Sequence, residues 1–188
     1  MAKNFFSIVN ENPIIAAINH EEKVEKAIAS PCNAVFLLIG DILSLGDMVD
    51  TLKKNGKSVY VHMDLIEGLS KDIPAMRYIN RQVRPDGIIT TKTNLVKAGR
   101  EADIFVIQRL FLLDSMALDS GIESIKKIRP NAVEILPGIM PKVVKRIYRE
   151  TRTPIITGGL IKDKEDVIQS LNSGAVAISS SNEEVWYM

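Results

Sequence analysis

Two glycines and a run of serines near the end of the chain form a pattern that suits a phosphate group. Thr157-Gly158-Gly159-Leu160 follows one apolar run, and Ser179-Ser180-Ser181 follows the next. Glycine lets backbone N–H groups approach an anion closely, and serine hydroxyls donate further hydrogen bonds. If the two runs are the last strands of a parallel barrel, their loops meet where such barrels commonly bind phosphate. The pattern favours a phosphate site over two tight turns that need glycine only for their geometry.

Polar and charged side chains also follow other apolar runs. Lys92 and Arg109 stand where a second charge contact to an anion would form, although either one can equally pair with a neighbouring carboxylate. Asp64 and Glu134 suit the hydroxyl groups of a polyol, or the roles of general acid and base. For Glu134, a salt bridge that closes one layer of a barrel is a competing interpretation. Asn19 ends the first apolar run and joins this set of candidate ligand-binding residues.

The sequence offers little for metal or nucleophilic chemistry. It has two histidines, His20 and His62, and no H-x-H or C-x-x-C spacing, so we expect no metal site. It contains no G-x-S-x-G or P-loop motif, and no G-x-G-x-x-G follows the first apolar run. These absences disfavour hydrolase, P-loop and dinucleotide-binding functions, and we expect no bound cofactor. The single cysteine, Cys32, is expected to be a buried, small apolar side chain.

Lysine and arginine side chains gather on two predicted helices. On residues 141–151 they recur at the i, i+3, i+4 and i+7 positions of one helical face, and a shorter stripe lies on residues 73–83. Such stripes are usually solvated outer faces, but a nearly neutral protein can also hold an RNA backbone through them. The residues that we consider for RNA contact are Lys142, Lys145, Arg146, Arg149, Arg77 and Arg81.

The elements that must position these residues alternate along the chain. Eight apolar runs predict strands, and charged segments with helical period separate them. The runs are apolar throughout, which is typical of parallel strands covered on both faces. We predict an α/β fold, a compact (β/α)8 TIM-like barrel with a truncated last helix from Glu183 onward, with a Rossmann-like sheet as the alternative. The strands are predicted at residues 13–18, 34–39, 58–63, 87–90, 103–108, 132–136, 154–157 and 175–179, and the helices at 20–29, 45–55, 73–83, 93–101, 114–128, 141–151 and 164–172.

Length and composition fit this architecture. The 188 residues suffice for one domain, placed at residues 1–188, and 46% hydrophobic with 25% charged residues is typical of globular proteins. A formal net charge of +1 gives no overall attraction to nucleic acid or membranes. The first residues do not have the pattern of a signal peptide, and no apolar stretch approaches the ~20 residues of a membrane span. We therefore expect a soluble, cytoplasmic protein.

Longer strings of the sequence resemble one family over nearly the whole chain. They are Val61-His-Met-Asp-Leu-Ile-Glu-Gly-Leu69, Asp86-Gly-Ile-Ile-Thr-Thr-Lys92, Glu134-Ile-Leu-Pro-Gly138, Ile156-Thr-Gly-Gly-Leu-Ile161 and Gly174-Ala-Val-Ala-Ile-Ser-Ser-Ser181, among others. In this order they are similar to the bacterial glycerol-3-phosphate-responsive antiterminators, the regulatory proteins of glycerol uptake operons. The family tends to carry Ser-Thr-Lys and Ser-Thr-Ser where this chain has Thr90-Thr91-Lys92 and Ser179-Ser180-Ser181.

The resemblance implies a TIM-like barrel that binds sn-glycerol 3-phosphate and then acts on the leader mRNA of glycerol-utilisation genes, so that transcription continues past a terminator. It implies a regulator rather than an enzyme; the alternative is an isomerase or aldolase that acts on a small sugar or polyol phosphate. It gives no role to a membrane and leaves a homo-oligomer open. By motif position, the phosphate residues are Gly158, Gly159, Ser180 and Ser181, and the residues near the glycerol end are Asp64, Lys92, Arg109 and Glu134.

Overall fold

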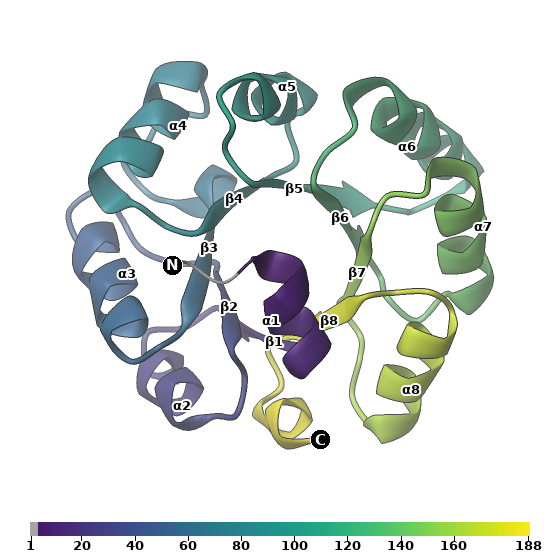
Figure 1. Ribbon diagram of the computed structural model, residues 1–188, viewed down its shortest axis with the longest axis horizontal. Helices are drawn as coiled ribbons and strands as arrows, with labels where there is room; N and C mark the ends of the chain where they lie inside the picture. Colours follow the sequence, from purple (N-terminus) through teal and green to yellow (C-terminus); the bar gives the residue numbers. More distant parts are fainter. Residues whose placement is uncertain (1–3) are drawn as a thin grey trace.

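The computed structural model describes residues 4–188, in which eight parallel strands close into a barrel (Figure 1). Each strand pairs with the next along the chain, and the last strand pairs with the first. This is the architecture predicted from the alternating sequence pattern. The strands are β1 (Ile14–Ile18), β2 (Ala34–Leu37), β3 (Ser58–His62), β4 (Gly87–Thr90), β5 (Val106–Phe111), β6 (Ala132–Leu136), β7 (Ile155–Gly158) and β8 (Ala177–Ser180).

An outer ring of helices surrounds the strands (Figure 1). The eighth unit ends in η3 (Glu183–Tyr187), a 3-10 helix of five residues in place of a full helix, as predicted. α4 continues into one π-helical segment, Ile79–Val83. Among the described helices, none is both long and apolar enough to cross a membrane. The ring consists of α2 (Lys23–Ala29), α3 (Leu45–Lys54), α4 (Ile73–Tyr78), α5 (Thr93–Glu101), α6 (Ser115–Ile128), α7 (Pro141–Thr151) and α8 (Lys164–Asn172).

Local sequence explains where several of these helices begin and end. The side chains of Asp114 and Asp163 accept hydrogen bonds from the first turns of α6 and α8, which leaves fewer unpaired backbone N–H groups there. Gly56 and Gly174 follow α3 and α8 with φ of +78° and +102°, a conformation that favours glycine.

The strands carry two apolar faces. Outward side chains such as Val35, Val59 and Val106 pack beneath the helices in the largest core cluster. Inward side chains such as Phe36 and Ile107 fill the barrel and form a separate cluster. Both faces are therefore buried, which explains why the strand sequences are apolar without alternation.

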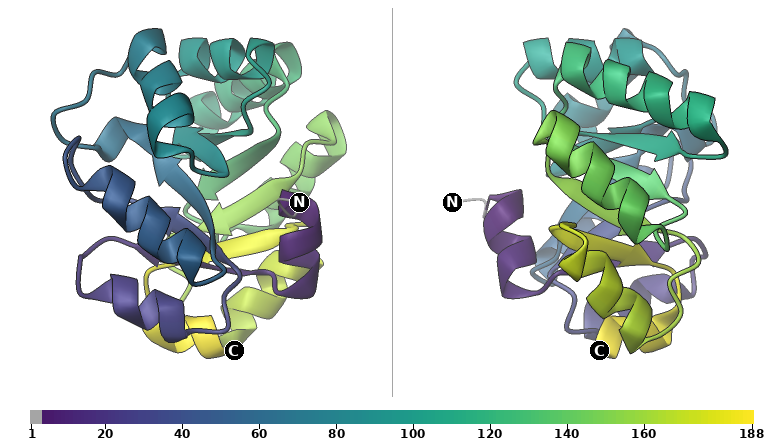
Figure 2. Two further views of the ribbon diagram at one scale, coloured as in Figure 1. Left: turned by 60° about the vertical axis from the view of Figure 1, so that its left-hand side comes forward. Right: turned by 90° about the vertical axis from the view of Figure 1, so that its right-hand side faces the viewer.

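An additional helix, α1 (Phe5–Glu11), closes one end of the barrel and was not predicted (Figure 2). Phe5, Ile8 and Val9 are buried and belong to the same cluster as the inward side chains. The ring of Phe5 lies 5.2 Å from that of Tyr60 and 5.1 Å from that of Phe105, which precedes β5. Because this plug covers the amino ends of the strands, a ligand has access to the interior from the carboxyl ends.

One strand boundary differs from the prediction in a way that matters for the site. β5 runs from Val106 to Phe111 rather than over residues 103–108, so Arg109 lies within the strand and not in the loop after it. The register pairs Arg109 with Glu134 on β6. Inward side chains from neighbouring strands at the same height therefore meet inside the barrel, close to its open end.

Candidate functional site

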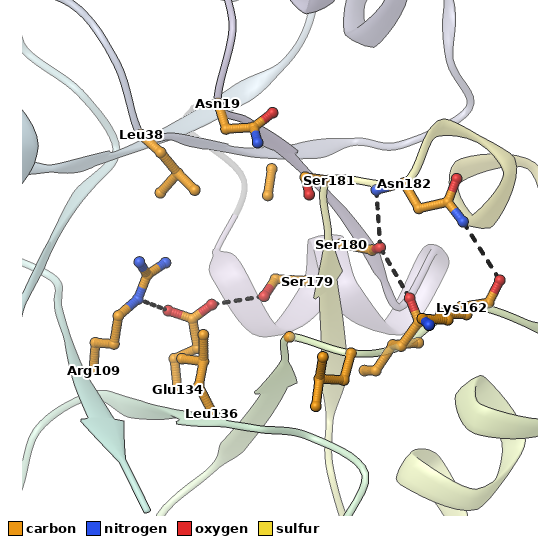
Figure 3. A pocket seen from close by; sticks show the side chains of 14 residues that line it. Asn19, Leu38, Arg109, Glu134, Leu136, Lys162, Ser179, Ser180, Ser181 and Asn182 are labelled. Carbon is orange, nitrogen blue, oxygen red and sulfur yellow. Dashed lines mark hydrogen bonds and ion pairs between the residues drawn. The ribbon is translucent and has the colours of Figure 1, made fainter.

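A buried ion pair lies at the open end of the barrel. Arg109 Nε donates to Glu134 Oε2 at 2.6 Å, and Ser179 Oγ donates to Glu134 Oε1 at 2.6 Å (Figure 3). Arg109 is 7% exposed and Glu134 is 1% exposed. The two terminal nitrogens of Arg109 point away from Glu134 (Figure 3) and make no hydrogen bond within the described part of the chain. The pair thus supports the competing interpretation of Glu134, but it leaves Arg109 with free donors.

Gly158 keeps this network intact because it has no side chain. A Cβ at this position would collide with Ser179 Oγ and lie 3.0 Å from Glu134 Oε1. Gly138 is similarly confined, since a Cβ there would lie 2.9 Å from the backbone nitrogen of Gly158. Gly158 does not line the cavity described next, so the structure gives it a packing role where the sequence predicted a phosphate contact.

A cavity of about 340 Å³ opens between the loops that follow β7 and β8 (Figure 3). The backbone N–H groups of Gly159, Leu160, Ile161 and Ser181 make no hydrogen bond to any described residue. Leu160 has φ of +61°, which a residue with a side chain seldom adopts, and it follows Gly159 at φ of +72°. Strained backbone of this kind is concentrated at binding sites. The two loops meet as predicted and offer free amide donors.

The two loops are tied to each other by side chains. Asn182 N donates to Ser180 Oγ at 3.1 Å, and the Ser180 hydroxyl faces Ile161 O at 3.5 Å. Lys23 Nζ donates to Ser181 O at 2.7 Å. The Ser180 hydroxyl is therefore occupied in holding the loop, whereas the Ser181 hydroxyl makes no hydrogen bond within residues 4–188.

Lys162 lies on the wall of the cavity and was not singled out in the sequence. Its side chain is exposed and forms no ion pair with any described carboxylate. With Arg109 and Glu134 it gives the cavity wall two positive charges and one negative charge. This balance favours an anion. Its position four residues after Gly158, in the loop after the seventh strand, is the signal that would have found it.

Asn19 lines the same cavity. Its Oδ1 is buried and has no hydrogen-bond partner among the described residues. A buried acceptor without a partner costs about 1–3 kcal/mol. The amide nitrogen of Asn19 faces the cavity (Figure 3), so the structure brings Asn19 together with the predicted phosphate loops as a donor.

Asp64 lies at the same open end but outside the cavity. Its carboxylate accepts hydrogen bonds from Thr90 Oγ1 at 2.7 Å, Thr91 N at 2.7 Å and Thr91 Oγ1 at 2.8 Å. Burial alone would raise the pKa of Asp64, but the hydrogen bonds from Thr91 and Thr90 outweigh it and lower that pKa. Lys92, at the start of α5, is exposed and also lies outside the cavity. Neither residue lines this cavity, and the β4 loop holds the Asp64 carboxylate in place, so their assignment to ligand binding stays a prediction.

His62 faces the barrel interior beside this sector and is 2% exposed. Burial and then the positive charge of Arg109 lower the pKa of His62 to about 4, although Asp64 acts in the opposite direction. Its Nδ1 is buried without a hydrogen-bond partner among the described residues. Within residues 4–188 no group of three or more His, Cys, Asp or Glu side chains is arranged to hold a metal ion.

The two basic stripes lie on the outer ring, away from the cavity. Lys142, Lys145 and Arg149 are exposed on α7. Arg77 on α4 and Arg81 on the π-helical segment that follows it are also exposed. Arg146 differs from the others in its stripe: it pairs with Asp119 at 2.8 Å and with Glu150 at 3.0 Å. Those contacts neutralise Arg146, which weakens the prediction that it contacts RNA.

The sequence was compared with models of known protein families and with individual proteins. Residues 14–186 match the model of a family described as glycerol-3-phosphate responsive antiterminator. The chain is 36% identical over 179 residues to the uncharacterized protein YgcP of Escherichia coli, covering 95% of this chain and 94% of that protein.

Two solved structures of antiterminator proteins are similar to this chain in sequence and fold. The glycerol uptake operon antiterminator regulatory protein of Listeria monocytogenes has 34% identity and a TM-score of 0.90, with 93% of this chain and 95% of that chain covered. A glycerol uptake operon antiterminator-related protein of Thermotoga maritima has 34% identity and a TM-score of 0.84, covering 93% of this chain and 98% of that chain. An aldolase with 16% identity and a TM-score of 0.70 shares the barrel fold alone.

Proposed function

The chain belongs to the glycerol-3-phosphate responsive antiterminator family, and on that premise we propose that it is a cytoplasmic metabolite sensor. It binds sn-glycerol 3-phosphate in the cavity between the loops after β7 and β8. The loaded protein binds the leader mRNA of glycerol-utilisation genes, and transcription continues past the terminator. No chemical step on the ligand is part of this function.

The observation that carries the proposal is a set of unused hydrogen-bond donors around one small cavity. The free backbone N–H groups of Gly159, Leu160, Ile161 and Ser181 suit the oxygens of a phosphate dianion, and the Lys162 ammonium adds charge. A cavity of about 340 Å³ is at the lower end of the range for small-molecule sites, which fits a three-carbon phosphate.

The glycerol end of the ligand has partners on the opposite wall. The amide nitrogen of Asn19 faces the cavity, and the terminal nitrogens of Arg109 are donors without an acceptor among the described residues (Figure 3). A ligand hydroxyl can accept hydrogen bonds from both groups. Glu134 contributes by fixing Arg109 through the ion pair and not by direct contact.

The enzymatic alternative has less support in the site. Asp64 and Glu134 were the two carboxylates suited to acid and base chemistry. Asp64 accepts three hydrogen bonds from the β4 loop, and both oxygens of Glu134 are engaged by Arg109 and Ser179. A general base must reach the proton that it removes, and neither carboxylate is placed to do so.

RNA contact is assigned to the exposed members of the two stripes, on α7 and on α4 with its π-helical continuation. A ligand changes RNA affinity only if it binds the RNA-competent state more tightly than the other state. The loops after β7 and β8 connect the cavity to α8 and η3 and are the parts that a bound phosphate would stabilise.

Isothermal titration calorimetry tests the ligand. We expect saturable one-site binding of sn-glycerol 3-phosphate, with weaker binding of inorganic phosphate and none of glycerol. A gel shift on leader RNA, with and without the metabolite, tests the output. Turnover of triose or pentose phosphates, or equal binding of RNA in the presence and absence of the metabolite, would contradict the proposal.

A further inference from the structure

Charge is divided unequally between two halves of the chain. Residues 73–152, which include α4 to α7, hold 15 lysines and arginines against 8 aspartates and glutamates, a net charge of +7. The remaining residues hold 9 against 15, a net charge of −6. Because α4, α5, α6 and α7 follow one another around the barrel (Figure 1), the positive half forms one continuous sector. The near-neutral total conceals a local field that suits a polyanion.

A groove of about 480 Å³ lies in the middle of this sector, between α5 and α6. It shares no lining residue with the metabolite cavity. In the ring of helices, α4 neighbours α5 and α7 neighbours α6 (Figure 1), so the helices that carry the two stripes flank the groove. Most of the residues that line it carry a polar group, although apolar atoms make up most of its surface. They include Asn94 and Lys97 from α5, and Ser120, Glu123, Ser124 and Lys127 from α6.

Gln108 lies one hydrogen bond behind this groove. Its side chain is 1% exposed, and its Nε2 donates to Ser124 Oγ at 3.0 Å. The Oε1 of Gln108 is buried with no partner in the described part of the chain. The Ser124 oxygen accepts this bond while its hydroxyl donates to no described residue. Gln108 therefore orients Ser124 so that its hydrogen is available to an acceptor in the groove.

Two lysines stand on opposite walls of the groove. Lys97 is 71% exposed, and its ammonium lies 3.9 Å from the Glu101 carboxylate. Because a long contact at the surface is weak, a phosphate can readily replace Glu101 as the partner of Lys97. Lys127 is exposed and forms no ion pair with the described carboxylates. Both charges are thus available to phosphates that flank a group bound between them.

We propose that the α5–α6 groove holds one unpaired nucleotide of the RNA. The Ser124 hydroxyl donates to an acceptor on the base edge, the Glu123 carboxylate accepts from a base N–H group, and Lys97 and Lys127 contact the flanking phosphates. A base in a duplex presents its edge to its partner, so the groove takes a nucleotide from a single-stranded loop or bulge. This inference rests on the proposed RNA-binding function and adds to it the place where sequence is read.

The experiment uses fluorescence anisotropy with the full chain, saturated with sn-glycerol 3-phosphate. The probes are 12-nucleotide oligomers of A, C and U, a 12-base-pair RNA duplex and the leader transcript. We expect single strands to bind more tightly than the duplex, with a preference for one base. Ser124→Ala should remove that preference and weaken the preferred oligomer about fivefold to tenfold. Thermal melts establish that each variant is folded.

The lysines are tested separately. K97A/K127A should weaken the binding of all single-stranded oligomers alike. It should also reduce the slope of log affinity against log salt concentration by about 1.4. K54A/K164A removes two exposed lysines from the acidic half and serves as the matched control, with affinity unchanged.

Two results would overturn the groove and leave the proposed function standing. One is the absence of any base preference, or its retention in Ser124→Ala. The other is an RNA affinity of K97A/K127A that equals that of the control K54A/K164A, together with a loss of RNA binding in K142A/K145A/R149A. Failure of the loaded wild-type protein to bind any of the RNA probes, the leader transcript included, would instead contradict the proposed function itself.

Discussion

Two sectors of the open end of the barrel look alike in sequence but differ in structure. Each has polar residues directly after its strands: Asp64, Thr91 and Lys92 at β3 and β4, and Gly159 and Ser181 at β7 and β8. In the β3–β4 sector the carboxylate and the hydroxyls satisfy one another. In the β7–β8 sector the backbone donors have no partner. Polarity at strand ends thus marks the open end, and unused hydrogen-bonding capacity marks the candidate binding site.

The largest effect is expected from removing Arg109, which joins the two sectors. Arg109→Met leaves the buried Glu134 carboxylate without its cation, which should lower the free energy of unfolding by about 3–5 kcal/mol. Urea unfolding followed by circular dichroism measures this. R109M/E134M should recover part of the loss, because no buried charge then lacks a partner. Equal losses in the single and double variants would show that the ion pair is not the cause.

The β3–β4 sector should respond to pH. The folded pKa of His62, about 4, lies below its ordinary value of 6.5, so the unfolded chain binds a proton first as pH falls. The contribution of His62 to the free energy of unfolding is fully present above pH 6.5. It decreases towards pH 4 by up to about 3 kcal/mol. The lowered pKa of Asp64 acts in the same direction, but only below its ordinary value of 3.8.

Urea unfolding at pH 7, 5.5 and 4 measures that slope. His62→Gln should have a flatter profile between pH 6.5 and 4, because the substituted amide does not titrate. An identical profile in the wild-type protein and the variant would assign the slope to other groups.

A smaller effect is expected from a methyl group at Gly158. Gly158→Ala should destabilise the protein by about 1–3 kcal/mol, because the added methyl group collides with Ser179. It should also weaken the binding of the metabolite by displacing Arg109 and Glu134. Gly46→Ala on α3 is the control, since no atom lies within 4 Å of the added group, and it should stabilise by up to about 1 kcal/mol. Thermal melts measure the stability of the two variants, and calorimetric titration measures their affinity for the metabolite. A stable Gly158→Ala with unchanged affinity would contradict the packing role.

The smallest effect separates the two sectors most cleanly. Lys162→Met should weaken sn-glycerol 3-phosphate about threefold to fivefold, because the ammonium lines the cavity in an exposed position. Lys92→Met, at the start of α5, should leave the affinity unchanged. Calorimetric titration at low salt measures both. The reverse ranking would move the anion site to the β3–β4 sector.

The sequence predicted the barrel well because its signals are local. Eight apolar runs and their helical separators are visible without knowledge of contacts, and the glycine and serine loops follow the last two runs. α1 was missed because Phe5, Ile8 and Val9 become a core only when Tyr60 and Phe105 are brought to them.

The site was predicted only in part because its contacts join distant residues. Asp64 is satisfied by residues 26 and 27 positions later, and Glu134 by Ser179, 45 positions later. Side-chain spacing along the chain does not show such saturation. The same reason explains why Gln108 and Ser124 were not recognised as a pair.

Titration of the 15N-labelled protein with sn-glycerol 3-phosphate, followed in 1H–15N correlation spectra, tests the central claim most directly. It reports on the amide N–H groups that are proposed to bind the phosphate. We predict saturable shifts at Gly159, Leu160, Ile161 and Ser181, with small changes at Thr91 and Lys92. Shifts confined to Thr91 and Lys92, or no shift at the four amides at saturating ligand, would contradict the account.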